Sequence, residues 1–453
     1  MSPLVRDPKN QDNQTVKSFS KTGIYKRIRK SPRDANDSEQ LKRFNYFHAT
    51  DPEFLQKILR QWENDSSLEV TSVDEIPACA VGVNYMSVVN RINVTGKRYN
   101  GSPYQISLIS KNLFEDKCHQ EVFHSLELFS NETKAYEAFS SLFSKEQKLF
   151  PKCLYADGEL IVLEDLKSLG FVMADKLKGL DFDHTKLVLE TLAKFHAASF
   201  VLEYTEPEKY ADIRRNIKEV VFPPGYEHNG MKSMMNNIGR TSSFFLQVGA
   251  TPEDNHAKEI AYLSEIGDKV YDTLKELLRP KKYAAMCAGD CWISNLLFKY
   301  EDFESEQSKV QRVSEVRLID FQGSRFSSVA TDILYFLHTT VDHALIKERY
   351  DEIIQIYHAT LIKNLSTRVP SKVIKDLSID WLKNELKTYE QYGFFMSLWL
   401  APVTTLEQKL MLDASTVASI ASANGYITPD YLKDRISPAL LSRVHDICKY
   451  FLK

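Results

Sequence analysis

Three side chains able to orient a hydroxyl group and bind a metal ion stand at the ends of two predicted strands. Asp290 and Asn295 lie on a loop that runs directly into a strand at 296–300, and Asp320 directly follows a strand at 316–319. In an antiparallel hairpin, the start of one strand and the end of the other share an open end. We therefore expect Asn295 and Asp320 to lie side by side, with Asp290 within reach of the same point.

Two carboxylates and one amide at one point are the groups that phosphoryl transfer needs. One carboxylate orients and deprotonates the attacking hydroxyl, while an amide and a second carboxylate are hard oxygen ligands for Mg²⁺. A single Asp ahead of a strand is usually a turn former or a cap. The second Asp at the far end of the same hairpin favours a catalytic site over that simpler interpretation.

The first half of the chain predicts a small lobe that mixes helices and strands. Asp51 is placed to cap an amphipathic helix over 52–62, because apolar residues recur there at helical spacing. Residues 67–113 are β-branched and alternating, which predicts about three antiparallel strands. A helix around 129–139 follows, and then two short strands joined by a turn at 157–158.

The second half is predicted to be chiefly helical, with Asp183 as the N-cap of one helix. It is interrupted by the hairpin described above, whose strands are separated by a charged segment, 301–312, that we expect to be a loop. The fold class is therefore α+β and bilobal. We expect a disordered basic tail at 1–45, an N-lobe at 46–166 and a helical C-lobe at 167–453.

Composition excludes several classes of protein. The chain has 453 residues, 43% hydrophobic and 26% charged, with a formal net charge of -3, so no electrostatic bias toward nucleic acid exists. No apolar stretch is long enough for a membrane span, and the N-terminus has no signal-peptide pattern. We interpret the six scattered cysteines as reduced thiols. The expectation is a cytoplasmic protein with a small-molecule partner, and without nucleic-acid or membrane partners.

The catalytic segment resembles that of the ecdysteroid kinase-like family, also called CHK kinase-like, within the aminoglycoside phosphotransferase and choline kinase group. The likeness rests on the segment 288–295 with its Trp292, and on the triplet Asp320-Phe321-Gln322. By order of motifs it extends from about Trp62 to the C-terminus. The resemblance implies a protein-kinase-like fold and the transfer of a phosphoryl group from ATP, with Mg²⁺, to a hydroxyl.

The same resemblance implies roles for five residues. Asp290 is the expected catalytic base, and Asn295 and Asp320 are the expected metal ligands. Lys111, at the end of a predicted strand, is similar to the lysine that holds the α- and β-phosphates, and Glu132 is similar to the helix glutamate that pairs with it. Taken singly, a Lys or a Glu is more often a solvated surface charge.

Four further residues are implied in nucleotide binding. The stretch 82–87 is similar to a family turn that covers the phosphates, in which Asn84 and Ser87 are the expected contacts, although a simple hairpin turn explains it equally well. The segment containing Glu164 and Leu166 looks like the family's hinge, where extended backbone hydrogen-bonds the adenine edge.

Three further positions concern the support of the catalytic loop. Asp332 is implied as the structural aspartate below that loop, whereas we interpret His196 as a packed core histidine. Ala288 occupies the position where the family usually has a His that packs against the loop, and its presence is expected to loosen the placement of Asp290.

Several functions remain open at this stage. An active kinase of an ecdysteroid, another sterol or a xenobiotic alcohol is the leading hypothesis, and the alternative is a weakened pseudokinase that binds a ligand or partner. A protein kinase is disfavoured because no A-P-E segment follows Asp320. A cationic acceptor such as choline is a narrower possibility. The acceptor pocket is expected to involve the insert at 222–255 and the aromatic run at 389–399, although aromatics at that density are more often core.

Overall fold

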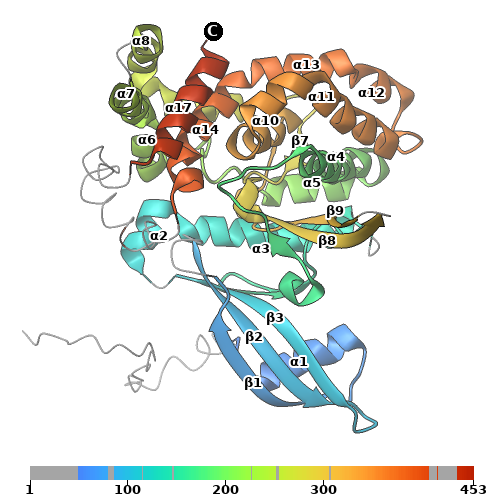
Figure 1. The fold of residues 1–453 in the computed structure, drawn as a ribbon. Coiled ribbons are helices and arrows are strands. Elements are labelled where there is room, and N and C mark those ends of the chain that lie inside the picture. Colours follow the sequence, from blue (N-terminus) through green and yellow to red (C-terminus); the bar gives the residue numbers. More distant parts are fainter. Residues whose placement is uncertain are drawn as a thin grey trace, which may run out of the picture. The chain divides into compact units, whose positions relative to one another are not determined.

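The N-terminal half of the described chain is an antiparallel sheet with three helices, and the remainder is mainly helical (Figure 1). The computed structural model describes residues 49–79, 86–114, 116–144, 147–225, 227–250, 255–305, 308–407, 416 and 436–452. The predicted tail at 1–45 and the predicted phosphate contact Asn84 lie outside these residues. Contacts group His48–Lys453 into one compact unit, and everything below concerns that unit.

The sheet of the N-terminal half has five strands in the order β1-β2-β3-β5-β4, and every neighbouring pair is antiparallel. Alternating side chains of the sheet form a buried cluster with helix α1, because Ile92 and Leu108 pack with Phe54 and Leu59. As predicted, Asp51 caps α1: its carboxylate accepts from two backbone amides of the first turn. The elements are α1 (Pro52–Glu63), β1 (Glu69–Pro77), β2 (Ser87–Lys97), β3 (Pro103–Leu113), α2 (Lys117–Phe123), α3 (Ser125–Leu142), β4 (Cys153–Ala156) and β5 (Leu160–Glu164).

The second half is organised around two apolar clusters. One joins α4, α10 and α11 with the base of the β8–β9 hairpin, and the other joins α6 to α9 with α14 and α17. The elements are η2 (Leu166–Leu169), β6 (Val172–Met173), α4 (Phe182–Thr205), α5 (Pro207–Asn216), α6 (Asn229–Asn236), α7 (Ile238–Gly249), α8 (Ala257–Ile266), η3 (Gly267–Lys269), α9 (Val270–Leu277), β7 (Ala285–Cys287), η4 (Ile293–Asn295), β8 (Leu296–Ser305), β9 (Ser308–Leu318), β10 (Arg325–Ser327), α10 (Val329–Thr340), α11 (His343–Leu365), α12 (Ser371–Asp376), α13 (Ile379–Thr388), α14 (Glu390–Thr405) and α17 (Pro438–Phe451).

Helix α3 connects the two halves. It contacts β3 and β4 on one side and α4 and α5 on the other, and it lies between the sheet and the helical part (Figure 1). The predicted α+β, bilobal fold class is confirmed. The proposed lobe limits at 166 and 167 stay a prediction, although the sheet ends nearby, at Glu164.

Two local predictions were wrong. The N-cap of α4 is Asp181, whose carboxylate accepts from the His184 amide, whereas Asp183 lies within the first turn. The segment 301–312 is not a loop, because β8 and β9 pair through it as far as Ser305 and Ser308. Backbone hydrogen bonds alone sustain such a ladder, so a run of charged residues signals solvent exposure of the ribbon and not a loss of strand structure.

The predicted aromatic run at 389–399 is largely buried. Tyr389, Tyr392 and Phe395 have no exposed surface, so most of this run is apolar core, as its density of aromatic residues suggested. No helix among the described residues is both long and apolar enough to cross a membrane.

A buried ion pair anchors the end of β5. Asp165 accepts hydrogen bonds from Arg91 Nε at 2.7 Å, Ser107 Oγ at 2.6 Å and the Lys167 amide at 3.0 Å. Burial acts to raise the pKa of Asp165, but the bonds from Arg91 and Ser107 outweigh it and lower the pKa. The carboxylate therefore ties strands β2 and β3 to the segment that leaves the sheet.

We predict that Asp165→Asn lowers the free energy of unfolding by about 2 kcal/mol at pH 7, because the partly buried guanidinium of Arg91 loses its charged partner. Urea denaturation measures the change. The control is Asp212→Asn, which removes an exposed ion pair with Arg215 and is expected to change stability by less than about 0.5 kcal/mol. Equal effects of the two substitutions would contradict the anchoring role.

Candidate active site

The β8–β9 hairpin brings the predicted catalytic residues to its open end. Leu296 pairs with Leu318 in register, and one step further the Ile319 amide donates to the Asn295 carbonyl at 3.0 Å. Asp320 is the next residue, with a left-handed backbone at φ +66°. A non-glycine residue in that region is uncommon and often marks a functional turn. The hairpin thus delivers Asn295 and Asp320 to one end, as expected from the sequence.

The Lys111 ammonium joins this end of the hairpin to the N-terminal sheet and to helix α3. Its Nζ lies 2.5 Å from Glu132 Oε2 and 3.2 Å from Asp320 Oδ1. Lys111 is 5% exposed and Glu132 1%. Burial acts to lower the pKa of Lys111, but the two carboxylates outweigh it and raise the pKa, so the amine keeps its proton.

One ammonium is shared by two carboxylates, and the balance of charge is therefore negative. Burial raises the pKa of Glu132, and the charge of Asp320 adds to the rise that Lys111 opposes. Nearby, burial raises the pKa of Asp290 to about 6, and the charge of Asp320 adds to that rise as well. A bound divalent cation would relieve this excess of negative charge.

Two hydrogen bonds orient the Asp290 carboxylate. Tyr335 OH donates to Oδ1 at 2.6 Å, and Asn295 Nδ2 donates to Oδ2 at 3.0 Å and to the Asp290 carbonyl at 2.9 Å. Both bonds act to lower the pKa that burial raises. Because the amide nitrogen of Asn295 is committed to Asp290, its oxygen is the atom left for a metal ion.

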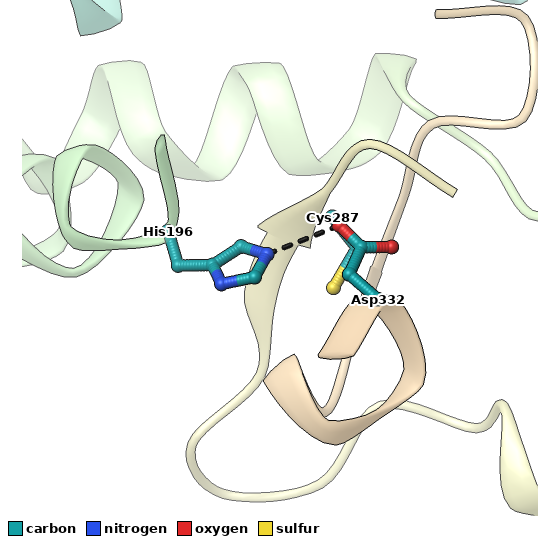
Figure 2. Close-up of side chains that lie close together, drawn as sticks. All are labelled: His196, Cys287 and Asp332. Atoms are coloured by element: carbon teal, nitrogen blue, oxygen red, sulfur yellow. Dashed lines mark hydrogen bonds and ion pairs between the residues drawn. The ribbon is translucent and has the colours of Figure 1, made fainter. Parts of the chain in front are cut away.

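A buried carboxylate below the catalytic loop holds the loop backbone. Asp332 accepts from the Ala288 amide at 2.6 Å and from the Gly289 amide at 3.0 Å. His196 Nε2 lies 3.1 Å from the same carboxylate (Figure 2) and its Nδ1 lies 2.7 Å from Tyr357 OH. Burial acts to raise the pKa of Asp332, but the bond to His196 and the charge of Arg325 lower it.

These contacts decide two of the sequence interpretations. His196 has no exposed surface and is a hydrogen-bonded core histidine. The backbone amide of Ala288 donates to Asp332, which holds the loop at this residue. The loosening expected from Ala288 therefore has no counterpart among the described contacts of the loop.

His196, Cys287 and Asp332 lie close together (Figure 2), and their possible ligand atoms are within 4.8 Å of one another. This cluster has the contacts of a hydrogen-bond network. The Cys287 thiol lies 3.5 Å from the Ser328 carbonyl, and burial followed by the charge of Asp332 raises its pKa. Both Asp332 oxygens already accept from loop amides, and one of them also contacts His196 Nε2, so we assign the cluster to support of the loop.

Two backbones approach each other closely behind Asp290. Gly289 has φ +87°, and a Cβ built there would lie 1.9 Å from the Gly323 carbonyl oxygen; glycine is therefore required at 289. The Arg325 guanidinium lies 3.4 Å from the Gly289 carbonyl and 3.3 Å from the Gly323 carbonyl, and donates to Tyr392 OH at 2.6 Å. Arg325 thus joins the catalytic loop to the segment that follows Asp320.

Helix α3 also holds the segment after Asp320. Asn131 Nδ2 donates to the Gln322 carbonyl at 3.0 Å and to the Ser324 carbonyl at 2.7 Å, and its Oδ1 accepts from the Lys218 amide at 3.0 Å. Since Glu132 is the next residue of α3, one turn of this helix positions both Lys111 and the Asp320 segment.

The other predicted nucleotide contacts lie on the sheet and its exit. Ser87 is the first residue of β2 and is buried. Glu164 ends β5, where it pairs with Leu108 of β3. The Leu166 carbonyl accepts from the Gly170 and Phe171 amides. The roles of Ser87, Glu164 and Leu166 in nucleotide binding stay predictions.

The family match agrees with this arrangement. The ecdysteroid kinase-like family matches residues 81–368, which is more than half of the chain and includes Lys111, Asp290 and Asp320. The chain belongs to the ecdysteroid kinase-like family. It is accordingly a small-molecule kinase, a phosphotransferase with a hydroxyl acceptor, and the family resemblance inferred from the sequence is confirmed.

Solved structures similar to the chain come from the wider phosphotransferase group. Spectinomycin phosphotransferase APH(9)-Ia bound to AMP is 13% identical, covers 87% of this chain and 98% of its own, and has a TM-score of 0.35. A choline/ethanolamine kinase family protein from Mesorhizobium loti is 12% identical, with 78% and 89% covered and a TM-score of 0.29. ADP-bound aminoglycoside phosphotransferase APH(2'')-Ib is 11% identical, with 74% and 98% covered and a TM-score of 0.31. No curated protein matches the chain.

Sequence reasoning missed Tyr335 and Arg325, which both reach the catalytic loop. For Tyr335 a signal existed: it lies three residues after Asp332 in a helical segment, and residues at that spacing share a helix face. An aspartate expected below the loop thus implied that position 335 faces the loop as well. No comparable pattern in the sequence marks Arg325.

We predict that Asp332→Asn lowers the free energy of unfolding by about 3 kcal/mol, because an amide nitrogen replaces one of the oxygens that accept from buried N–H groups. Activity should fall by about 100-fold as the loop carrying Asp290 shifts. Urea denaturation and steady-state rates measure the two effects. The control Asp351→Asn removes an exposed ion pair with Lys383 and should change neither the stability nor the rate. If Asp332→Asn had the stability and the rate of the original protein, Asp332 would not have this role.

We predict that Tyr335→Phe shifts the acidic limb of the pH–rate profile upward by about one pH unit, because Asp290 loses a hydrogen bond to its ionised form. The shift is measured on kcat/KM between pH 5 and 9. A purely structural role of Tyr335 would lower the rate equally at every pH and leave the midpoint of the limb unchanged.

Proposed function

We propose that this chain transfers the γ-phosphoryl group of ATP, with Mg²⁺, to a hydroxyl of an ecdysteroid, a related sterol or a xenobiotic alcohol. The observation that carries the proposal is the meeting of Asp290, Asn295 and Asp320 at one hairpin end beside the Lys111–Glu132 pair. This is the set of groups required to orient a hydroxyl, hold a metal ion and bind phosphates.

Lys111 is the proposed phosphate-binding cation. Its raised pKa keeps the ammonium charged, and Glu132 fixes its position from helix α3. The amine is also 3.2 Å from Asp320 Oδ1. In the proposed complex, an ATP phosphate would replace the Asp320 carboxylate as a partner of the Lys111 amine.

Asp290 is the proposed general base. A carboxylate with a pKa of about 6 is ionised at neutral pH and is a stronger base than an ordinary aspartate, which suits the removal of a hydroxyl proton. The bonds from Tyr335 and Asn295 hold its two oxygens. The acceptor hydroxyl donates to Asp290, and the proton passes to that carboxylate as the oxygen attacks phosphorus.

Asn295 and Asp320 are the proposed Mg²⁺ ligands, and the donor set fits the ion. Both offer oxygen atoms, which Mg²⁺ prefers, and one or two protein ligands are usual where phosphates complete the coordination. The excess of buried negative charge around Lys111 supports a divalent cation at this place. When bound, Mg²⁺ would neutralise charge on the phosphate oxygens.

The proposal of a large apolar acceptor rests on the family and on the surroundings of Asp290. Trp292 lies two residues after the base, its amide donates to the Asp290 carbonyl at 3.1 Å, and its indole is partly exposed. The indole packs against both apolar clusters of the helical half. This partly exposed indole beside the base offers a flat apolar wall, as a fused-ring alcohol would require.

We predict that the purified protein consumes ATP in the presence of Mg²⁺ and an ecdysteroid, a sterol diol or a hydroxylated plant toxin, and that the product gains one phosphoryl group by mass. Choline and kanamycin serve as cationic comparators. Phosphorylation of these two and of no apolar alcohol would reject the proposed acceptor class.

We predict that Asp290→Asn lowers kcat by at least about 100-fold while ATP binding is retained, because only the base is lost. Asp320→Asn should abolish the Mg²⁺ dependence of ATP binding, which calorimetry measures. Asp212→Asn, an exposed residue far from these groups in sequence, is the matched control. Full activity of Asp290→Asn would reject the assigned base, and absence of both turnover and Mg²⁺-dependent ATP binding in the unaltered protein would favour the pseudokinase alternative.

A further inference from the structure

Two buried histidines and an arginine meet where α17 packs on the helical half. His338 lies in the last turn of α10 and His343 is the first residue of α11; they are 2% and 8% exposed. His338 Nδ1 lies 3.2 Å from His343 Nε2. The Arg443 guanidinium of α17 donates to the His338 carbonyl at 2.7 Å and to the Val341 carbonyl at 3.5 Å. We call His338, His343 and Arg443 the histidine cluster.

Side chains of α17 cover both imidazole rings. The His338 ring centroid is 4.9 Å from that of Tyr450 and 4.5 Å from that of Phe451. The His343 ring centroid is 5.1 Å from that of Tyr450. The same helix contacts α7 and α14 (Figure 1). Both histidines therefore owe part of their burial to α17, and their rings would meet water if this helix moved away.

The histidine cluster has no place for an added proton. His343 Nδ1 is buried and makes no hydrogen bond within the described part of the chain. A proton on this atom would have no acceptor, so the neutral ring carries its proton on Nε2, which donates to His338 Nδ1. A further proton would have to lie on His343 Nδ1 without a partner, or on His338 Nδ1, which already accepts a hydrogen bond.

The charges around the cluster also oppose protonation. Burial, followed by the charges of His343 and Arg443, lowers the pKa of His338 well below its usual value. Burial and the charge of Arg443 lower the pKa of His343 to about 3, and the Asp342 carboxylate opposes this only in part. The other titratable groups that act on Arg443 or on the covering Tyr450 are Asp446, Tyr350 and Glu390.

From this geometry we infer that the histidine cluster makes the docking of α17 sensitive to acid. At neutral pH both rings are neutral, and α17 is held by the bonds of Arg443 and by the ring contacts of Tyr450 and Phe451. As the pH falls, the state in which α17 has moved away is favoured, because only in that state do both rings take up protons. This behaviour does not depend on the function proposed above.

The direction and the pH range follow from proton linkage. A histidine in water has a pKa of about 6.5, and both histidines have lower values while α17 is docked. The free energy of docking is therefore fully present above about pH 6.5 and is lost as the pH falls below that value. From about pH 7.5 to about pH 5.5 the equilibrium constant for release rises by about tenfold for each ring that takes up a proton, and by about 100-fold for both.

Release of α17 would reach the surroundings of the catalytic loop. Leu440 and Val444 of α17 belong to the same apolar cluster as Tyr335, whose hydroxyl donates to Asp290. Removal of the helix takes away part of the packing that holds Tyr335. The histidine cluster thus connects acidity to the residue that orients the proposed base.

Two buried cysteines of the full chain allow a direct test. Cys448 lies on α17 and is 1% exposed, so its labelling reports release of the helix. Cys287 of β7 has no exposed surface and reports global unfolding. The reagent is dithiodipyridine, which reacts with thiols in weak acid, and mass spectrometry maps the labelled sites. Each rate is divided by the rate of the same thiol in the urea-unfolded chain at that pH, which removes the intrinsic pH dependence of thiol labelling.

We expect the relative rate at Cys448 to rise by about 100-fold between about pH 7.5 and about pH 5.5, while the rate at Cys287 stays low. A rate at Cys448 that does not change with pH would overturn the inference. A rise at Cys448 that runs in parallel with Cys287 would also overturn it, because the whole chain would then be unfolding.

Two variants each remove one titrating ring and keep the hydrogen bond between positions 338 and 343. In His343→Gln the amide nitrogen donates to His338 Nδ1, and in His338→Gln the amide oxygen accepts from His343 Nε2. Each should reduce the pH effect at Cys448 to about tenfold. His445→Gln, at a partly exposed position of the same helix, is the matched control and should retain the full effect.

Labelling of Cys287 shows whether a variant is folded, and if one glutamine variant unfolds the other decides. An undiminished pH effect in a folded glutamine variant would exclude its histidine from the inferred role, and the same result in both would overturn the inference. All of these measurements are independent of catalytic activity.

Discussion

The buried carboxylate of Asp332 is the interaction on which the active site depends. It accepts the two backbone amides of Ala288 and Gly289 and is itself held by His196. A charge at this depth is tolerated only when hydrogen bonds satisfy it. The catalytic loop therefore has one position in which the buried charge is stabilised, and in that position Asp290 faces the hairpin end.

A second constraint is the excess of negative charge among the buried carboxylates of the active site. Glu132 and Asp320 share the single ammonium of Lys111, and Asp290 is affected by the charge of Asp320. Burial raises the pKa of both Asp290 and Glu132. Such a cluster is costly in the free protein, and it is least costly when a divalent cation and phosphates are bound. The same charges that oppose folding thus favour the proposed ligands, a trade between stability and function that is common at active sites.

The contacts predicted correctly from the sequence are those that local backbone geometry determines. Asn295 and Asp320 were placed together because the register of a single hairpin leaves little choice. Lys111 is paired with Glu132 only through the family resemblance, since 21 residues separate the two in the chain. Its contact with Asp320, 209 residues away, is not among the predictions from the sequence. Arg325 and Tyr392 meet through tertiary packing of segments that share no pattern. Residues 301–312 were misjudged because their charges describe exposure to solvent and carry no information on backbone pairing.

Helix α3 shows why the remaining contacts of the site could not be predicted from the sequence. Two consecutive residues of one turn, Asn131 and Glu132, hold the Asp320 segment and Lys111. The sequence predicts that these residues lie on one helix, but their partners come from β3 and from the segment after Asp320, which tertiary packing brings to α3. A helix that contacts both halves of the protein cannot move without changing the Lys111–Glu132 pair. Any ligand that binds α3 more tightly in one position therefore changes the state of the catalytic cluster as well.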